Sequence, residues 1–335
     1  MSGNRDQQFR LYVISAFSAV RQVDFRWWGI TSALFWILSC AIGVVGSLNT
    51  VVELNVRFAV FVSIFGILAS ISSIFSITGI WNLIRVRHKF FKYLASREDQ
   101  QAVLKAQLAI DIKNDRDGKE ILEINTKALL QNASGLSRFF SFAKDDKKTY
   151  EFSILNSLAY YDNIFGQNPR KKFQRNQKIS SKNGLSQLLL RRSQSEKYWA
   201  ISALFPMTAE QWNGYLYSKK SDNDFQTDWL LETKDTSKIE AALIFSFGAI
   251  SGIVGKKDFV DPIYGPISPG KLVLVGVFWH LATLLTQMTR KRTIDVYIAA
   301  NDKPVIDVFH AFGFSSTLLS TGDDIPVFHA RIRAV

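Results

Sequence analysis

WWGITSALFWILSCAIGVVGSL, from Trp27 to Leu48, contains no charged side chain. After a short polar connection, a second uncharged run extends from Phe58 to Ile84. About 20 residues of α-helix span the roughly 30 Å of hydrocarbon in a bilayer, so each run is long enough to cross it. We therefore predict a transmembrane helical hairpin at residues 27–84.

A second apolar pair follows at Ile239–Gly255 and Leu272–Met288, and the basic sequence TRKRT ends it. The first of these runs is short and carries Glu240 at its edge, so the pair is either a full hairpin or a re-entrant element. We predict a second hairpin at 239–289. The expected fold class is a membrane α-helical protein with four spans and a cytoplasmic α+β domain.

Composition and flanking charge agree with this prediction. The 335 residues are 47% hydrophobic and carry a net charge of +12, and Arg and Lys gather beside the apolar runs, as they do on the cytoplasmic side of membrane proteins. We expect a multi-pass protein of the bacterial inner membrane with both termini cytoplasmic. Residues 1–26 have helical apolar spacing and predict an interfacial amphipathic helix, or one packed on the aqueous domain.

We expect the polar region at 85–238 to contain three structural parts. Helices are expected within 85–165, at 98–113, 118–131 and 148–165, followed by a mobile basic loop at 166–184. Residues 197–232 read as βαβ: a strand at 198–205, a helix opened by a capping box of Thr208 and Gln211, and a strand at 225–231.

The tail at 290–335 repeats this order. We expect a strand at 294–299, a helix opened by Asp302 and Pro304 and closed by Gly313, and strands at 316–320 and 326–332. Because about 40 residues rarely bury a stable core alone, the tail is expected to pack on 197–232 as a split βαβ domain.

Small residues on the apolar runs predict close helix packing. Packing within one subunit is the first interpretation; in the alternative, several subunits assemble and the serine face lines a water-filled path. His280 is the central ionisable candidate, either a proton or metal group or a neutral packed imidazole. These helix-packing or membrane-path residues are Ser39, Gly43, Ser72, Ser73, Ser76, Gly248, Gly252 and His280.

The strongest basic cluster is expected to bind anionic lipid headgroups. A solvated loop without a partner and a nucleic-acid site are the alternatives, although one phenylalanine gives poor interleaving for base stacking. The cluster consists of Arg170, Lys171, Lys172, Arg175 and Lys178.

Catalytic signatures are sparse. The sequence has no phosphate-binding glycine loop of Walker or dinucleotide type, no HExxH motif, one cysteine (Cys40) and four histidines. One group of histidines and aspartates lies close together in the tail, and its spacing matches no metal site. Its members are His310, His329, Asp307, Asp323 and Asp324. We therefore expect no catalytic residue, no metal and no cofactor.

The resulting hypothesis is a non-enzymatic, homo-oligomeric membrane effector. Its cytoplasmic domain would sense an unknown ligand or partner protein and alter membrane permeability, by analogy with bacterial stress and phage-defence effectors. The first alternative is a membrane-anchored scaffold or assembly factor. The second is a membrane-bound enzyme that uses the histidines and aspartates of the tail.

Overall fold

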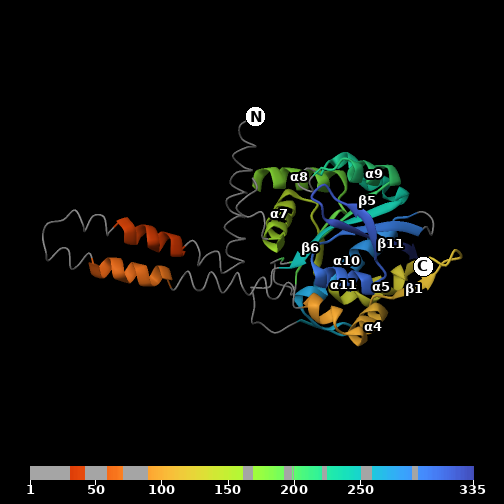
Figure 1. Cartoon of the computed structure of the whole chain (residues 1–335), viewed down its shortest axis with the longest axis horizontal. Coiled ribbons are helices and arrows are strands. Elements are labelled where there is room, and N and C mark those ends of the chain that lie inside the picture. Colours follow the sequence, from red (N-terminus) through yellow and green to blue (C-terminus); the bar gives the residue numbers. More distant parts are fainter. Residues whose placement is uncertain are drawn as a thin grey trace. The chain divides into compact units, whose positions relative to one another are not determined.

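The computed structural model describes residues 31–41, 59–70, 90–160, 169–191, 198, 200–220, 225–249, 259–288 and 293–335 (Figure 1). The chain divides into two compact units. The smaller comprises residues 1–86 with 251–255, and the larger comprises 87–250 with 256–335.

The larger unit is built on a mixed nine-stranded sheet with the order β1-β2-β11-β9-β6-β5-β4-β3, in which β10 also pairs with β11. The strands are β1 (Ile110–Asn114), β2 (Glu120–Ile124), β3 (Phe140–Phe142), β4 (Gln187–Leu190), β5 (Ala200–Met207), β6 (Ala241–Ala249), β9 (Thr293–Ala299), β10 (Ser315–Ser320) and β11 (Pro326–Ala334). A separate two-stranded sheet pairs β7 (Phe259–Asp261) with β8 (Gly265–Ile267).

Helices cover both faces of this sheet (Figure 1). α7 packs against β4, β5 and β6 on one face, beside α8 and α9, whereas α10 packs against the same strands on the other face, near α5 and α11. The helices are α4 (Glu98–Gln107), α5 (Thr126–Asn132), α6 (Ser134–Ser137), α7 (Asp146–Tyr160), α8 (Pro169–Lys182), α9 (Ala209–Tyr217), α10 (Pro269–Leu285) and α11 (Lys303–Ala311), with 3-10 turns η2 (Thr227–Trp229) and η3 (Thr233–Lys238).

The predicted second transmembrane hairpin is wrong. Its first run contains β6, a central strand whose residues Ala241–Ile244 are all buried, and its second run contains α10, which is buried around most of its circumference. A strand covered on both faces and a helix enclosed by other elements both read as continuous apolar runs. Burial inside the protein therefore produced the signal that we had assigned to lipid.

The first predicted hairpin is described only in part. Two helices, at 31–41 and 59–70, contact each other: the Ser32 hydroxyl donates to the Ala69 carbonyl at 3.0 Å, and the Phe35 and Phe65 rings lie 6.0 Å apart. The remaining residues of 27–84, and the predicted interfacial helix at 1–26, lie outside the described residues.

Across the ranges that the structure describes, no helix is long and apolar enough to cross a membrane. The predicted four-span membrane fold is therefore corrected to an α/β fold with a large mixed sheet. The expected multi-pass location in the bacterial inner membrane and the function as a polytopic membrane effector are corrected with it.

Several local predictions in the remaining chain are confirmed. β5 and the capping box of Thr208 and Gln211 at the start of α9 form as expected, and so do β9, α11, β10 and β11 in the tail. The expected strand at 225–231 is instead the η2 turn. The expected helices at 98–113 and 118–131 form only in part, as α4 and α5, and the β1–β2 hairpin occupies the residues between them. The basic loop at 166–184 is largely α8.

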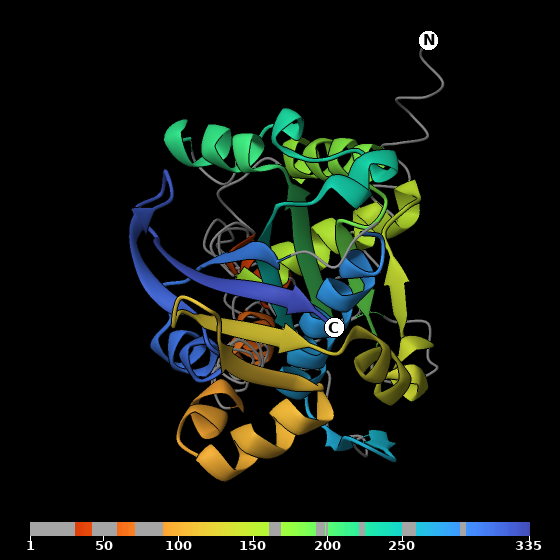
Figure 2. The ribbon, with the colours of Figure 1, turned by 90° about the vertical axis from the view of Figure 1, so that its right-hand side faces the viewer.

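The tail contacts residues 197–232 through the stack of Tyr297 on Trp212, but none of its described strands pairs directly with β5. β9 pairs in parallel with β6, and β6 pairs with β5, so β6 lies between the two expected halves. At its other edge, β9 pairs antiparallel with β11, and the carboxyl end of β11 pairs in parallel with β2 (Figure 2).

Candidate functional site

The parallel strands β6 and β9 pair over only four residues each. Their register runs from Ala241 opposite Asp295 to Ile244 opposite Ile298. β6 then continues to Ala249, still paired with β5. Since Ala203 lies opposite Ser246 and Leu204 opposite Ile244, Phe245 is an extra residue on β6. A bulge of this kind bends its strand, and such bulges occur often beside functional sites.

β9 remains with β11 where β6 leaves it. Ala299 lies opposite Val327, the Ala300 amide donates to the Pro326 carbonyl at 3.1 Å, and α11 begins at Lys303. Among the described strands, none pairs with residues 245–249 on the side that faces β9. The two strands thus part at their carboxyl ends, the edge at which ligands bind in many α/β sheets.

The two faces of the sheet differ in character at this point. On the α10 face, the Phe247 ring lies 5.6 Å from Phe309 of α11 and 6.1 Å from Phe91. Ser246 is the next residue along β6 and so points to the α7 face. It is 5% exposed, and its hydroxyl has no hydrogen-bond partner among the described residues. A buried hydroxyl without a partner destabilises the fold, which makes it a candidate ligand contact.

A polar cluster lies on the same face as Ser246. Along β9, Ile294, Val296 and Ile298 join the core, so Asp295 and Tyr297 point to the α7 face. Tyr297 lies opposite His329 of β11, whose Nε2 is 2.7 Å from the Asp295 carboxylate. The His329 and Asp295 side chains are 25% and 46% exposed, so ligands can reach them.

Aromatic stacking fixes one side of this cluster. The ring of Trp212, from α9, stacks on Tyr297 with centroids 3.9 Å apart and an interplanar angle of 13°. Burial, together with the nearby Asp295 carboxylate, raises the pKa of Tyr297 to about 12, so its phenol stays protonated at neutral pH. The His329 ring lies 5.0 Å from the Tyr297 ring.

Ion pairs continue the polar face toward the β1–β2 hairpin. Arg331 pairs with Asp115 at 3.1 Å, Arg333 with Glu123 at 3.4 Å, and Lys113 with Glu123 at 2.6 Å. Backbone amides, first that of Lys119, hold the pKa of Asp115 below its usual range. Arg331 is therefore already paired on the side away from Asp295.

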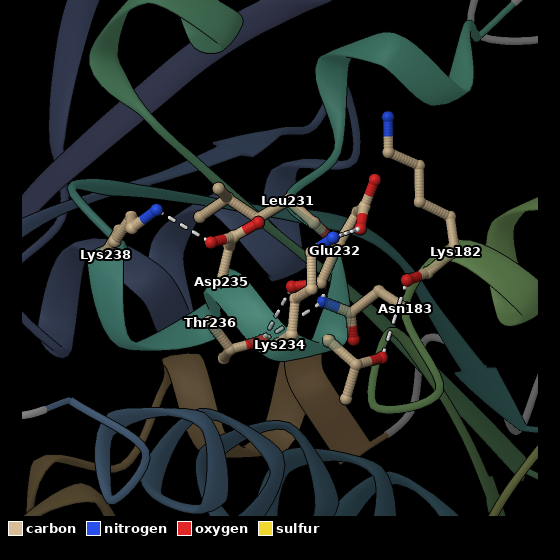
Figure 3. A network of polar contacts seen from close by, with 9 residues as sticks. Lys182, Asn183, Leu231, Glu232, Lys234, Asp235, Thr236 and Lys238 are labelled. Atoms are coloured by element: carbon tan, nitrogen blue, oxygen red, sulfur yellow. Dashed lines mark hydrogen bonds and ion pairs between the residues drawn. The ribbon is translucent and has the colours of Figure 1, made fainter.

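Hydrogen bonds join the segment that precedes β6 to the carboxyl end of α8 (Figure 3). The Asn183 amide donates to the Leu231 carbonyl at 3.0 Å and to the Thr236 hydroxyl at 3.4 Å. The Thr233 hydroxyl accepts from the Gly184 amide at 3.0 Å. Because Asn183 is fully buried, these bonds fix the segment that positions the amino end of β6.

His280, the central candidate of the sequence, is a buried core residue. It is fully enclosed in α10, with Nδ1 3.2 Å from the Ser202 hydroxyl of β5 and Nε2 against the Leu185 carbonyl. Burial lowers its pKa to about 4, so the ring is neutral at pH 7. It packs a helix onto a sheet, and no ligand can reach it without a rearrangement.

The predicted helix-packing residues do not form one site. Ser39 lies between the helices at 31–41 and 59–70 and donates to the Val62 carbonyl at 3.0 Å. Gly248 is part of β6 and not of a helix. The others, Gly43, Ser72, Ser73, Ser76 and Gly252, lie outside the described residues.

The predicted basic cluster lies along α8. Arg170, Lys171 and Lys178 are exposed, whereas Lys172 is buried and the Arg175 guanidinium lies 5.8 Å from the Phe245 ring centre. The cluster is therefore split between two sides of a helix. Its binding to an anionic surface stays a prediction.

The histidines and aspartates of the tail are also separated. Nδ1 of His310 is 2.7 Å from the Phe314 carbonyl, and Asp307 pairs with Lys303. His329 instead meets Asp295, which lies within the expected strand at 294–299 and was not among the candidate residues. In the described ranges, no three His, Cys, Asp or Glu side chains gather to hold a metal ion.

Comparison with known proteins adds little to this geometry. No family model matches the chain, and no curated protein matches it. One solved structure, the crystal structure of PH1933 from Pyrococcus horikoshii OT3, aligns with a TM-score of 0.35 and 12% identity over 57% of this chain and 98% of that chain. A likeness at this level carries no argument about function.

Proposed function

We propose that this protein is an acyltransferase that takes its acyl group from a coenzyme A thioester. The pantetheine arm of the donor would lie along the edge of β6 beyond Ile244, where β9 no longer pairs with it. The observation that carries the proposal is the buried Ser246 hydroxyl, which has no partner among the described residues, at the place where the two strands part.

The chemistry of the opening suits this ligand. A strand edge recognises an extended chain through amide hydrogen bonds, and the pantetheine arm is an extended chain with two amides. The unpaired edge of β6 lies between helices on both faces of the sheet, so it favours a thin chain without side chains over a peptide. The aromatic rings of Phe247 and Phe309 offer apolar contact to its methylene groups.

Calorimetric titration of the full chain with acetyl-coenzyme A, coenzyme A and free pantetheine tests the proposal. Binding of all three is expected, with pantetheine the weakest because it lacks the nucleotide. Ser246→Ala should weaken binding about fivefold, the effect of one lost hydrogen bond of about 1 kcal/mol.

Ser186→Ala provides the matched control, because the buried Ser186 hydroxyl already donates to the Asn183 carbonyl. This variant should lower stability and leave the affinity unchanged. Absence of binding by all three compounds at about 1 mM, which corresponds to a binding free energy weaker than about −4 kcal/mol, would overturn the proposal. Binding of an extended peptide in their place would assign the opening to strand addition.

A further inference from the structure

We propose that the acyl group of the donor ends in a second carboxylate and lies across β6, β5 and β4, where Gln187 binds that carboxylate; this inference rests on the proposed function. Three residues in one row of the sheet carry it. Gln187 of β4 lies opposite Ala203 of β5, and Ala203 lies opposite Ser246 of β6. Residues directly opposite each other in a sheet point to the same face, so the three side chains point the same way.

This row faces the helices α7 and α8. The hydroxyl of Ser202, the neighbour of Ala203, lies 3.2 Å from Nδ1 of His280 in α10. Successive residues of a strand point to opposite faces, so Ala203 points away from α10. The Ser180 hydroxyl of α8 donates to Gln187 Oε1 at 2.7 Å, which places the row on the α8 side of the sheet.

Each end of the row carries a buried hydrogen-bond donor. Gln187 is 1% exposed and Ser246 is 5% exposed. Among the residues that the structure describes, neither Gln187 Nε2 nor Ser246 Oγ has a hydrogen-bond partner. Unpaired groups of this kind destabilise a folded chain, and acceptor oxygens of a ligand would recover that free energy. Ala203 extends only a methyl group between them, so no larger side chain of the row separates the two donors.

The spacing of the two donors indicates the length of the ligand. The Cα atoms of Gln187 and Ser246 are two strand spacings, roughly 10 Å, apart. Two hydrogen bonds of about 2.9 Å each leave roughly 4 Å between the two acceptor oxygens of a bridging ligand. An acetyl group has a single oxygen, whereas the two carbonyl groups of a four-carbon dicarboxylic acid lie at about this separation. This favours a succinyl-type acyl group, with Ser246 beside the pantetheine arm and Gln187 at the far carboxylate.

The helix layer above the row favours an anion. The Arg175 guanidinium of α8 lies 5.8 Å from the ring centre of Phe245 in β6 and donates to Asn176 Oδ1 at 3.3 Å. Asn176 donates in turn to the Ser153 hydroxyl of α7 at 2.9 Å, and both of these side chains are uncharged. A carboxylate on this face is therefore stabilised by nearby positive charge as well as by an amide N–H.

The acyl group reaches this row only when the helix packing opens. α7 packs against β4, β5 and β6 on this face, and both donors are enclosed in the chain without ligand. Their unpaired polar atoms make the closed packing less stable than a fully paired core, which favours local opening. The bound carboxylate would then close the packing again by pairing the amide of Gln187.

Calorimetric titration of the full chain with acetyl-, butyryl- and succinyl-coenzyme A tests the inference. The butyryl group has the same four-carbon length as the succinyl group and lacks the second carboxylate. Succinyl-coenzyme A should bind at least about tenfold more tightly than butyryl-coenzyme A, the effect of one hydrogen bond to a charged group. Gln187→Met should abolish this preference and leave the affinity for acetyl-coenzyme A unchanged.

Gln187→Glu separates the binding of the ligand from the folding of the chain. It keeps an oxygen that accepts from the Ser180 hydroxyl, and it replaces the amide donor by an acceptor that repels the carboxylate of the ligand. Succinyl-coenzyme A should then bind more weakly than butyryl-coenzyme A. Gln177→Met is the matched control, because Gln177 of α8 donates to Asp146 in an exposed bond; it should leave the succinyl preference unchanged.

The outcomes distinguish this inference from the proposed function. Binding of succinyl-coenzyme A no tighter than that of butyryl-coenzyme A by the unaltered chain would overturn the inference and leave the acyltransferase proposal standing. So would a succinyl preference that both Gln187 variants retain. Failure of all three thioesters to bind would overturn both proposals. The comparison in the unaltered chain needs no variant, so it decides the matter even if a substitution at Gln187 prevents folding.

Discussion

At the scale of the residue, His280 makes the free energy of unfolding of the larger unit depend on pH. Burial lowers its folded-state pKa to about 4 from 6.5, so between these values the unfolded chain binds more protons than the folded chain. The stability contributed by the neutral ring is complete above about pH 6.5. It is lost as the pH falls toward 4, by about 3 kcal/mol in total.

Urea unfolding at pH 7 and pH 4.5 checks this linkage. The free energy of unfolding should fall by about 2 kcal/mol more in the unaltered chain than in His280→Gln, which has no group to protonate. Using the difference between the two proteins cancels the effect of the other titrating groups. Equal losses would show that His280 is not held neutral by its surroundings.

Without ligand, replacing Ser246 should not lower the free energy of unfolding. Its buried hydroxyl has no partner among the described residues, so Ser246→Ala removes a desolvated polar atom without breaking a bond. The free energy of unfolding should stay the same or rise by up to about 1 kcal/mol, although acetyl-coenzyme A binds more weakly. Thermal unfolding without ligand measures this, and a clear loss of stability would mean that the hydroxyl is bonded in the folded chain.

At the scale of the element, hydrogen bonds of the Asn183 side chain connect the end of α8 to the segment before β6. Asn183→Ala removes bonds to the Leu231 carbonyl and the Thr236 hydroxyl and leaves buried groups unpaired. We expect a loss of about 2–3 kcal/mol in the free energy of unfolding, measured in urea. Lys234→Ala, which breaks an exposed pair with Glu232, should leave the free energy of unfolding nearly unchanged and provides the control.

Local patterns identified many elements because their signals are short in range. The capping box of Thr208 and Gln211 and the alternation in β9 depend on residues within one turn or one strand, and both were predictable. β6 and α10 were not predictable, because an apolar run indicates only that its side chains avoid water. Lipid and a packed protein core both exclude water. The pairing of β6 with β5 and β9, which the run itself does not encode, shows that this segment lies in a core.

The candidate site could be predicted only in part for a related reason. Alternation placed Asp295 and Tyr297 on one face of a strand, but their meeting with His329 depends on the register between β9 and β11. Nothing in the composition of either strand determines that register. The unpartnered hydroxyl of Ser246 was equally hidden, because it depends on a bulge and on where β9 leaves β6.

At the scale of the whole molecule, the larger unit has its own core. Among the residues that the structure describes, the main buried cluster extends from Phe91 to Ile332, and all its members belong to the larger unit. A chain that begins at Arg87 should therefore unfold in one cooperative transition and keep its affinity for acetyl-coenzyme A within about threefold. Circular dichroism and calorimetry measure these two properties; a gradual, non-cooperative transition would contradict the prediction.

The pairing of β2 with β11 has a consequence for the speed of folding. Arg333 and Glu123 are 210 positions apart, yet they join adjacent strands. Closing so long a loop is entropically costly, and such distant contacts slow the search for the native topology. We expect the β1–β2 hairpin to form before β11 pairs with it, so the edge of β2 stays unpaired during that time. Self-association during refolding should therefore begin at this hairpin.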